Sequence, residues 1–240
     1  MAAHATTPLV LLAALLILAL LFDFLNGFHD SANIVATMIA SQAMSARGAL
    51  LLAALANLAG PFLLGVAVAH TVGAEVILPA AMTISVVLAA LAAASLWNLV
   101  TWYLGIPVSS SHALVGGLVG AAFLEAGGSS IQPAGIVKIV IALLLSPVLA
   151  FVAAVAVMAA TRRLLRDATP RAGIALSRLQ VVTATALALG HGANDAQKTV
   201  GMIAIGLLVL GYTQTFTVPW WSIALSAAAI ALGTALGGGR

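Results

Sequence analysis

The sequence predicts an all-α fold, a polytopic bundle of transmembrane helices. Of its 240 residues, 63% are hydrophobic and only 6% are charged, and the mean hydropathy is +1.19. Such values lie far outside the range of soluble domains. Several apolar runs also reach the ~20 residues that cross the hydrocarbon core of a bilayer. The runs are too long and too rich in Ala and Leu for the alternating strands of an outer-membrane barrel.

Apolar segments account for the expected helices in chain order. They cover approximately residues 8–25, 49–69, 81–104, 113–124, 136–160, 181–189, 200–210 and 220–236. No lone apolar stretch is followed by a small-residue cleavage site, so we interpret the first segment as a retained helix and not as a signal peptide. We therefore expect a multi-pass protein of the cell membrane, surrounded by lipid.

The basic residues predict how the chain is oriented. Five of the nine Lys and Arg residues lie within residues 162–178, and the N-terminus has none. The positive-inside rule makes residues 162–179 an Arg-rich cytoplasmic loop and places the N-terminus outside. An outside start and an inside loop require an odd number of crossings. Five crossings satisfy this, with starts at Pro8, Ala49, Ala81, Pro107 and Ile136. A nucleic-acid partner is not expected, because no soluble basic face exists.

A short polar motif occurs twice. GFHDSANIVA, residues 27–36, aligns with GANDAQKTVG, residues 192–201, at an offset of 165 residues. Two such units separated by an odd number of crossings point in opposite directions, which is the inverted-repeat plan of secondary transporters. We therefore expect a first membrane repeat at 1–161 and the start of an incomplete second repeat at 180–240.

Asp30 and Asp195 occupy matching positions in this motif. A lone Asp in a lipid-facing helix costs several kcal/mol, so intramembrane carboxylates normally face a cavity, a cation or a partner. Both are candidate ligands of a coupling ion, unless they are N-cap residues at interfacial helix ends. Gly27 and Gly192 precede them by three residues. We expect these glycines to break the helices and free backbone groups for ions.

The stretch GIPVSSSHALVGGLVGA, residues 105–121, predicts an anion site. Ser109, Ser110 and Ser111 follow Pro107 and should occupy the cap and first turn of a helix. Hydroxyls, free N–H groups and a positive dipole end suit an oxyanion such as phosphate. The alternative is that one serine merely caps its own helix. His112 is either a proton carrier or a packed, hydrogen-bonded histidine.

Other polar residues of the motif are candidates as well. Lys198 could neutralise Asp195 or hold an anion, or it could snorkel to the interface. His29 and His191 flank the two units and could carry protons. No zinc pattern, nucleotide loop or Ser/His/Asp order is present, so an enzyme is not expected.

The stretches NGFHDSANIVAT, IPVSSSHALVGGLVGA and GHGANDAQKTVG, in that order, resemble the inorganic phosphate transporter (PiT) family, in particular bacterial low-affinity members. The resemblance implies a cation-coupled symporter with two inverted repeats, which holds phosphate between the Asp units and Ser/Thr-rich hairpins. By position, Asp30, Asn33, Asn194 and Asp195 would belong to the substrate and coupling-ion site, and Ser109 to Ser111 to the phosphate hairpin. It implies no cofactor beyond a coupling H⁺ or Na⁺.

Two departures from the family matter. Sodium-coupled relatives tend to have a small residue and Asn where this chain has Gln197 and Lys198. We infer that the Lys198 ammonium fills the space of a sodium ion, which favours proton coupling and adds Lys198 to the substrate site. The family's second Ser/Thr-His hairpin is also missing before the final LGGGR, so we expect a truncated product or a fragment.

The leading hypothesis is proton-coupled uptake of inorganic phosphate by alternating access, with arsenate as an analogue. Open alternatives are a sulfate permease of the same architecture, a fragment that does not transport, and a channel. Also open are transport of phosphate as a metal complex and assembly into a homodimer.

Overall fold

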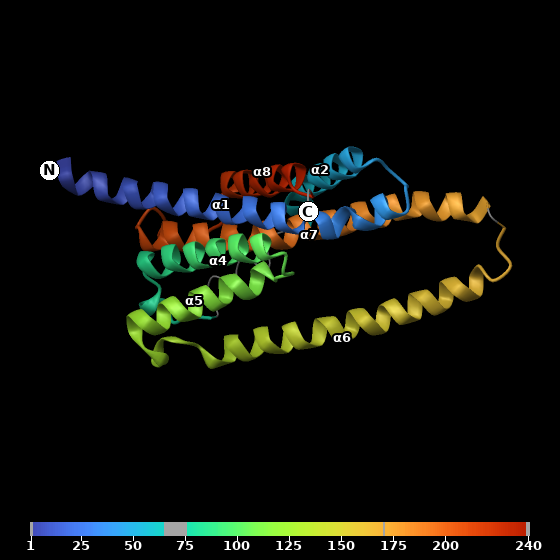
Figure 1. The fold of residues 1–240 in the computed structure, drawn as a ribbon. Coiled ribbons are helices and arrows are strands. Elements are labelled where there is room, and N and C mark those ends of the chain that lie inside the picture. The colour runs from blue at the N-terminus through green and yellow to red at the C-terminus, as the bar shows by residue number, and fades with distance from the viewer. Residues whose placement is uncertain (1, 65–75, 170, 239–240) are drawn as a thin grey trace.

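The computed structural model describes residues 2–64, 76–169 and 171–238, and it is almost entirely helical (Figure 1). Its α-helices are α1 (Ala2–Ala40), α2 (Ala46–Leu64), α4 (Ile84–Leu104), α5 (Ser110–Ala126), α6 (Pro133–Leu164), α7 (Arg171–Val209) and α8 (Trp220–Leu236). Two 3-10 helices lie at Pro79–Ala81 and Gly128–Ser130. The described residues form no β-strand beyond one isolated bridge. The all-α prediction is confirmed, while residues 65–69 of the expected segment 49–69 lie outside the described residues.

The turn between α4 and α5 follows the expected capping pattern. Gly105 ends α4 in the left-handed conformation, with φ of 66°, which glycine adopts without a steric penalty. Ser109 then caps α5, and its hydroxyl accepts a hydrogen bond from His112 N at 3.4 Å. Of the three serines, Ser109 therefore has the capping role, which leaves the other two hydroxyls free for different contacts.

In the part of the chain that the structure describes, five helices are long and apolar enough to cross a membrane: α1 from Thr7, α2, α4, α6 and α7 from Ala172. Among the described residues, four of them precede the Arg-rich segment. The serine-rich helix α5, which we expected to complete a fifth crossing there, has 17 residues and is not among the candidate spans, so five crossings before the Arg-rich segment stay a prediction.

The Arg-rich segment predicted as a loop at 162–179 is mostly helical. Helix α6 continues through Arg162 and Arg163 to Leu164, and α7 begins at Arg171. Cationic side chains stabilise the C-terminal turn of a helix through its dipole, which favours extension of α6 into the basic stretch. Among the described residues, the non-helical connection shrinks to residues 165–169.

Helices α1 and α7 cross at the centre of the bundle and run in opposite directions (Figure 1). Helix α8 packs along α1, α2 packs along α7, and α4 lies between α1 and α5. Helix α6 stands away from the bundle in Figure 1, and only Gly135 in it is buried.

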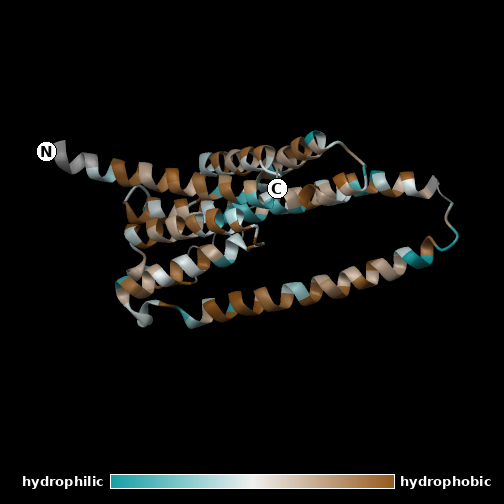
Figure 2. Cartoon of the chain, viewed as in Figure 1, coloured by the Kyte–Doolittle hydropathy of each residue, from teal (hydrophilic) through white to brown (hydrophobic). Residues whose placement is uncertain are grey.

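Two apolar clusters lie on either side of this crossing. The first joins Phe22 of α1, Leu91 of α4, Leu114 of α5 and Met202 of α7. The second is centred on Met38 and includes residues of α1, α2 and α7. Along both long helices the segment between the clusters is polar, and Figure 2 shows hydrophilic residues gathered there. The fold therefore encloses a polar layer between two apolar ones.

The helices are not broken at the polar motifs, contrary to the sequence prediction. Helix α1 continues through Gly27, and α7 continues through Gly192. Both glycines instead allow close helix packing: a Cβ atom at Gly27 would collide with the backbone carbonyl of Ile230, and one at Gly192 with that of Asn57. Small residues at helix contacts let two backbones approach.

Candidate functional site

The polar layer is built by an antiparallel register between α1 and α7. Thr199 contacts Asp23, Asp195 contacts Asn26, and His191 contacts Asp30. Each step forward along α1 is thus matched by a step backward along α7. This register brings the two predicted carboxylates, Asp30 and Asp195, to the same point in the bundle.

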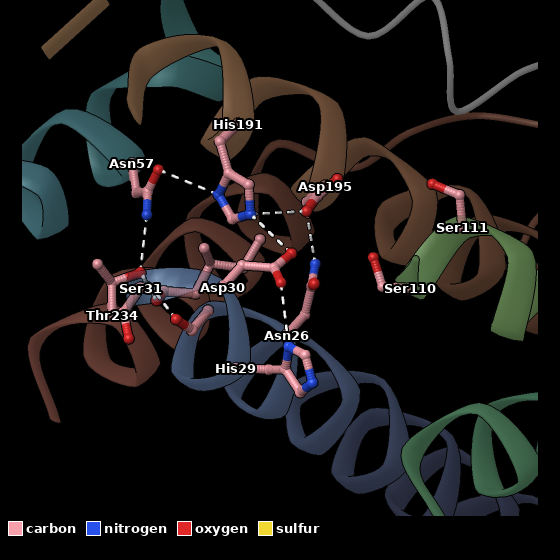
Figure 3. Close-up of polar contacts among 12 residues, drawn as sticks. Asn26, His29, Asp30, Ser31, Asn57, Ser110, Ser111, His191, Asp195 and Thr234 are labelled. Atoms are coloured by element: carbon pink, nitrogen blue, oxygen red, sulfur yellow. Dashed lines mark hydrogen bonds and ion pairs between the residues drawn. The ribbon is translucent and has the colours of Figure 1, made fainter. Parts of the chain in front are cut away.

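His191 lies between these carboxylates (Figure 3). Its Nε2 atom is 3.0 Å from Asp195 Oδ2 and 3.4 Å from Asp30 Oδ2. Its Nδ1 atom is 3.3 Å from Asn57 Oδ1. One ligand atom each from Asp30, His191 and Asp195 lies within 4.8 Å of the others. A shared proton or a small cation could be held at this spacing.

The hydrogen bonds around Asn57 determine how His191 is protonated. Thr234 Oγ1 donates to Ile230 O at 3.0 Å, so it accepts from Asn57 Nδ2 at 2.7 Å. The Asn57 amide oxygen then faces His191 Nδ1, which must carry a proton to donate. Because Nε2 faces two carboxylates, it must carry a proton too. The network favours an imidazolium ion.

Both oxygens of Asp195 have partners. Asn26 Nδ2 donates to Oδ2 at 2.7 Å, and Lys198 Nζ lies 2.6 Å from Oδ1. On the other carboxylate, Asp30 Oδ1 is 3.1 Å from His29 Nδ1. Two carboxylates are therefore balanced by the ammonium and an imidazolium. We call Asp30, His191, Asp195 and Lys198 the central cluster.

Lys198 connects the central cluster to the serine hairpin. Its ammonium donates to Ser111 Oγ at 2.7 Å and to Ser110 Oγ at 3.2 Å. With Asp195 as the third partner, all three ammonium protons are used. Lys198 is 5% exposed, so it does not snorkel to an interface. The structure therefore joins two predicted features that lie 87 residues apart in the sequence.

Four predicted site residues lie outside this network, and one of them is Ser109, which caps α5. Asn33 and Asn194 are exposed, as is His112. Asn33 and His29 line a cavity of about 430 Å³ that Pro107 and Trp102 also line, so Asn33 borders an opening next to the cluster. His112 instead lines an apolar groove between α4 and α5.

Sequence reasoning missed several buried polar residues of the site. They are Asp23, Asn26, Asn57, Thr199 and Thr234, each no more than 1% exposed. The signal for Asn57 was available, because it is a lone amide inside an apolar helix. Asn26 begins the quoted motif NGFHDSANIVAT but carries no charge that would have singled it out.

Comparison with known proteins finds similarity to phosphate transporters along nearly the whole chain. The phosphate transporter family matches residues 26–176 and 165–240. A probable low-affinity inorganic phosphate transporter of Rhizobium meliloti (strain 1021) is 45% identical over 238 residues, which cover 98% of this chain and 71% of that protein. A protein of the same description from Bacillus subtilis (strain 168) is 40% identical over 234 residues, covering 96% and 70%.

More distant relatives are also described as phosphate transporters. The low-affinity inorganic phosphate transporter PitA of Escherichia coli (strain K12) is 33% identical over 232 residues, covering 84% of this chain and 46% of that protein. A solved structure described as the sodium-dependent phosphate transporter matches with a TM-score of 0.81 at 21% identity, over 95% of this chain and 76% of that one. At that identity the likeness shows the shared fold.

The family and these relatives are transporters and not enzymes, which agrees with the sequence prediction that this chain is not an enzyme. The family matches together cover residues 26–240, and the relatives of Rhizobium meliloti and Bacillus subtilis are 45% and 40% identical over almost the whole chain. The resemblance in the three motifs is confirmed, and this chain belongs to the phosphate transporter family.

Proposed function

We propose that this chain transports inorganic phosphate together with protons by alternating access. The observation that carries the proposal is the position of Lys198, whose ammonium joins the Asp195 carboxylate to Ser110 and Ser111. A cationic group between hydroxyl donors and a carboxylate is suited to an oxyanion that can itself exchange a proton. The relatives described as phosphate transporters support phosphate as the substrate.

The substrate would enter through the cavity lined by His29, Asn33 and Pro107. It would replace the serine hydroxyls as acceptor for the Lys198 ammonium, and Ser110 and Ser111 would then donate to phosphate oxygens. The exposed amide of Asn33 at the cavity supports a first contact there.

Lys198 also supports proton coupling. Its ammonium contacts one carboxylate oxygen and two hydroxyl oxygens, which are the oxygen ligands that a sodium ion would otherwise use. With that place filled by a covalently attached cation, the mobile charge would be a proton. The His191 position between Asp30 and Asp195 supports a route for it.

Matching glycine contacts support two inverted repeats. Gly27 packs on Ile230, and Gly192, its equivalent in the second motif, packs on Asn57. The glycines on the partner helices make the equivalent contacts in return: Gly60 of α2 packs on Leu189 of α7, and Gly233 of α8 packs on Phe24 of α1. Each close pair, α1 with α8 and α2 with α7, therefore takes one helix from each repeat. Rocking of one pair against the other would open the polar layer to alternate sides.

Uptake into vesicles containing the purified chain would test the proposal. We expect an inward proton gradient to drive uptake of labelled phosphate without sodium. Arsenate should compete and selenate should not, whereas competition by selenate would favour sulfate transport. Vesicles that take up neither oxyanion would overturn transport by this chain alone.

The coupling ion has its own test. Lys198→Asn opens the place that the ammonium fills, so we expect uptake to become dependent on sodium. Arg47→Asn, at an exposed position of α2, is the control and should leave uptake independent of sodium. Sodium independence unchanged by Lys198→Asn would contradict this assignment.

A further inference from the structure

Asp23 is a buried carboxyl group that the central cluster does not use. It is 0% exposed on α1, two turns before Asp30. Thr199 donates to its Oδ1 atom at 2.5 Å. Ser226 of α8 lies beside the same carboxyl group, yet neither Ser226 Oγ nor Asp23 Oδ2 has a hydrogen-bond partner. One oxygen of this carboxyl is satisfied and the other is not.

No cation in the described part of the chain pairs with Asp23. The charged groups that act on it are Asp195 and Lys198 of α7, and these pair with each other at 2.6 Å. Helix α8 contains no titratable side chain, and the one on α4, Tyr103, is 73% exposed. Ala19 and Phe22, which lie close to it along α1, belong to the first apolar cluster.

The energetics favour a neutral acid at this position. A buried carboxylate is stable when it has a cation or several donors, and without them it takes up a proton instead. Asp23 has one neutral donor, Thr199. A proton on Oδ2 would turn the unsatisfied oxygen into a donor directed at Ser226, whose hydroxyl also lacks a partner. A single proton thus removes a fully buried charge that has no paired cation.

We propose that Asp23 is a second proton-binding site, separate from the central cluster and loaded in the arrangement seen here. As a role in transport, this rests on the proposed function. When α1 moves against α7, water reaches the carboxyl, the O–H bond breaks and the proton passes to water as hydronium. The electron pair stays on the carboxylate, which keeps the Thr199 hydrogen bond until a proton reloads it from the other side.

Infrared spectroscopy of the purified chain in vesicles tests whether Asp23 binds a proton, and this measurement does not depend on transport activity. We expect the wild type at neutral pH to show the carbonyl stretch of a protonated carboxyl group. Asp23→Asn should remove this band, and Thr199→Val should move it to higher wavenumber because Oδ1 loses its donor. Asp167→Asn removes an exposed carboxyl and should leave the band unchanged. A spectrum in which Asp23→Asn removes no such band overturns the proposal.

Transport measurements then separate this site from the proposed function. Asp23→Asn keeps the site neutral, so exchange of internal for external phosphate should persist while uptake driven by a proton gradient falls to background. Gradient-driven uptake at the wild-type level in Asp23→Asn would overturn the role of Asp23 in coupling. If the wild type transports no phosphate, the proposed function fails, and the infrared band alone decides whether Asp23 binds a proton.

Discussion

The Lys198 ammonium and the Asp195 carboxylate lie 2.6 Å apart, one turn from each other on α7. Both side chains are almost completely buried. The pair is therefore shielded from solvent, in the polar motif that lies between two apolar stretches of α7. The Lys198 ammonium also donates to Ser110 and Ser111 at the start of α5. This ion pair therefore connects the polar motif of α7 to the serine-rich stretch.

Breaking this pair should destabilise the protein. Lys198→Met leaves the Asp195 carboxylate buried without its nearest cation, and loss of one partner of a buried pair costs about 3–5 kcal/mol. Unfolding in detergent by denaturant, followed by circular dichroism, measures the change in the free energy of unfolding. Arg47→Met, at an exposed site, should change it by less than about 0.5 kcal/mol.

A double variant makes the same prediction sharper. Lys198→Met combined with Asp195→Asn removes both charges, so most of the lost stability should return. The coupling energy in the double-mutant cycle should be about 1–3 kcal/mol. Additive losses from the two single substitutions would show that the pair has no net interaction.

The glycines of the motifs provide a second prediction. Gly27→Ala and Gly192→Ala place a methyl group against a backbone carbonyl that cannot rotate away. Overpacking of this kind costs roughly 1–3 kcal/mol. Thermal unfolding of each variant in detergent should show a lower midpoint than the wild type.

Gly116 and Gly120 of α5 are matched controls, since a Cβ atom at either has no heavy atom within 4 Å. Ala at these positions should raise stability by up to about 1 kcal/mol through helix propensity. If all four substitutions behaved alike, the close packing of Gly27 and Gly192 would not be what selects glycine. The sequence prediction of unwound helices would then regain support.

These glycines also show what the sequence could and could not predict. The composition and the apolar runs were enough for the helical class, and carboxylates within apolar runs were enough to find Asp30 and Asp195. The function of Gly27 was misread, because a glycine that opens a helix and one that admits a neighbouring helix look identical in sequence. The neighbour, Ile230, lies about 200 residues away along the chain.

The same reason explains the incomplete list of site residues. Asn57 and Thr234 form a buried hydrogen bond across 177 residues of sequence, and nothing in either segment shows that the two residues are partners. Asn194 was predicted in the site and lies outside it, because consecutive residues of an intact helix point about 100° apart. In the unbroken α7, Asn194 lies on an exposed face and Asp195 is buried.

The contact between the ends of α4 and α5 predicts a pH dependence. Thr83 Oγ1 and Ser85 Oγ donate to Glu125 at 2.7 and 2.8 Å, and these hydrogen bonds lower the pKa of Glu125 below its ordinary value. A folded-state pKa below the unfolded one gives stability that is present above the unfolded pKa and is lost as the pH falls through the folded pKa. The contribution is small because the carboxylate is fully exposed to solvent.

We therefore expect Glu125→Gln to lower the unfolding midpoint slightly at neutral pH and to match the wild type in acid. Thermal unfolding of both proteins across this pH range measures the difference. Asp167→Asn is the control, because it removes an exposed acid with no such donors among the described residues. A difference between Glu125→Gln and the wild type that persists unchanged into acid would exclude the carboxylate as its source.

The three serines of the hairpin should separate into two roles. Ser109 caps α5, so Ser109→Ala should cost about 1 kcal/mol of stability with little effect on the apparent affinity for phosphate. Ser110 and Ser111 contact the Lys198 ammonium, so Ala at either position should raise the KM of phosphate uptake about tenfold, as expected when one hydrogen bond to a charged group is lost. Unfolding curves and uptake kinetics on the same preparations distinguish the roles. An equal rise in KM for all three variants would mean that the hairpin binds phosphate as a whole and that capping does not set Ser109 apart.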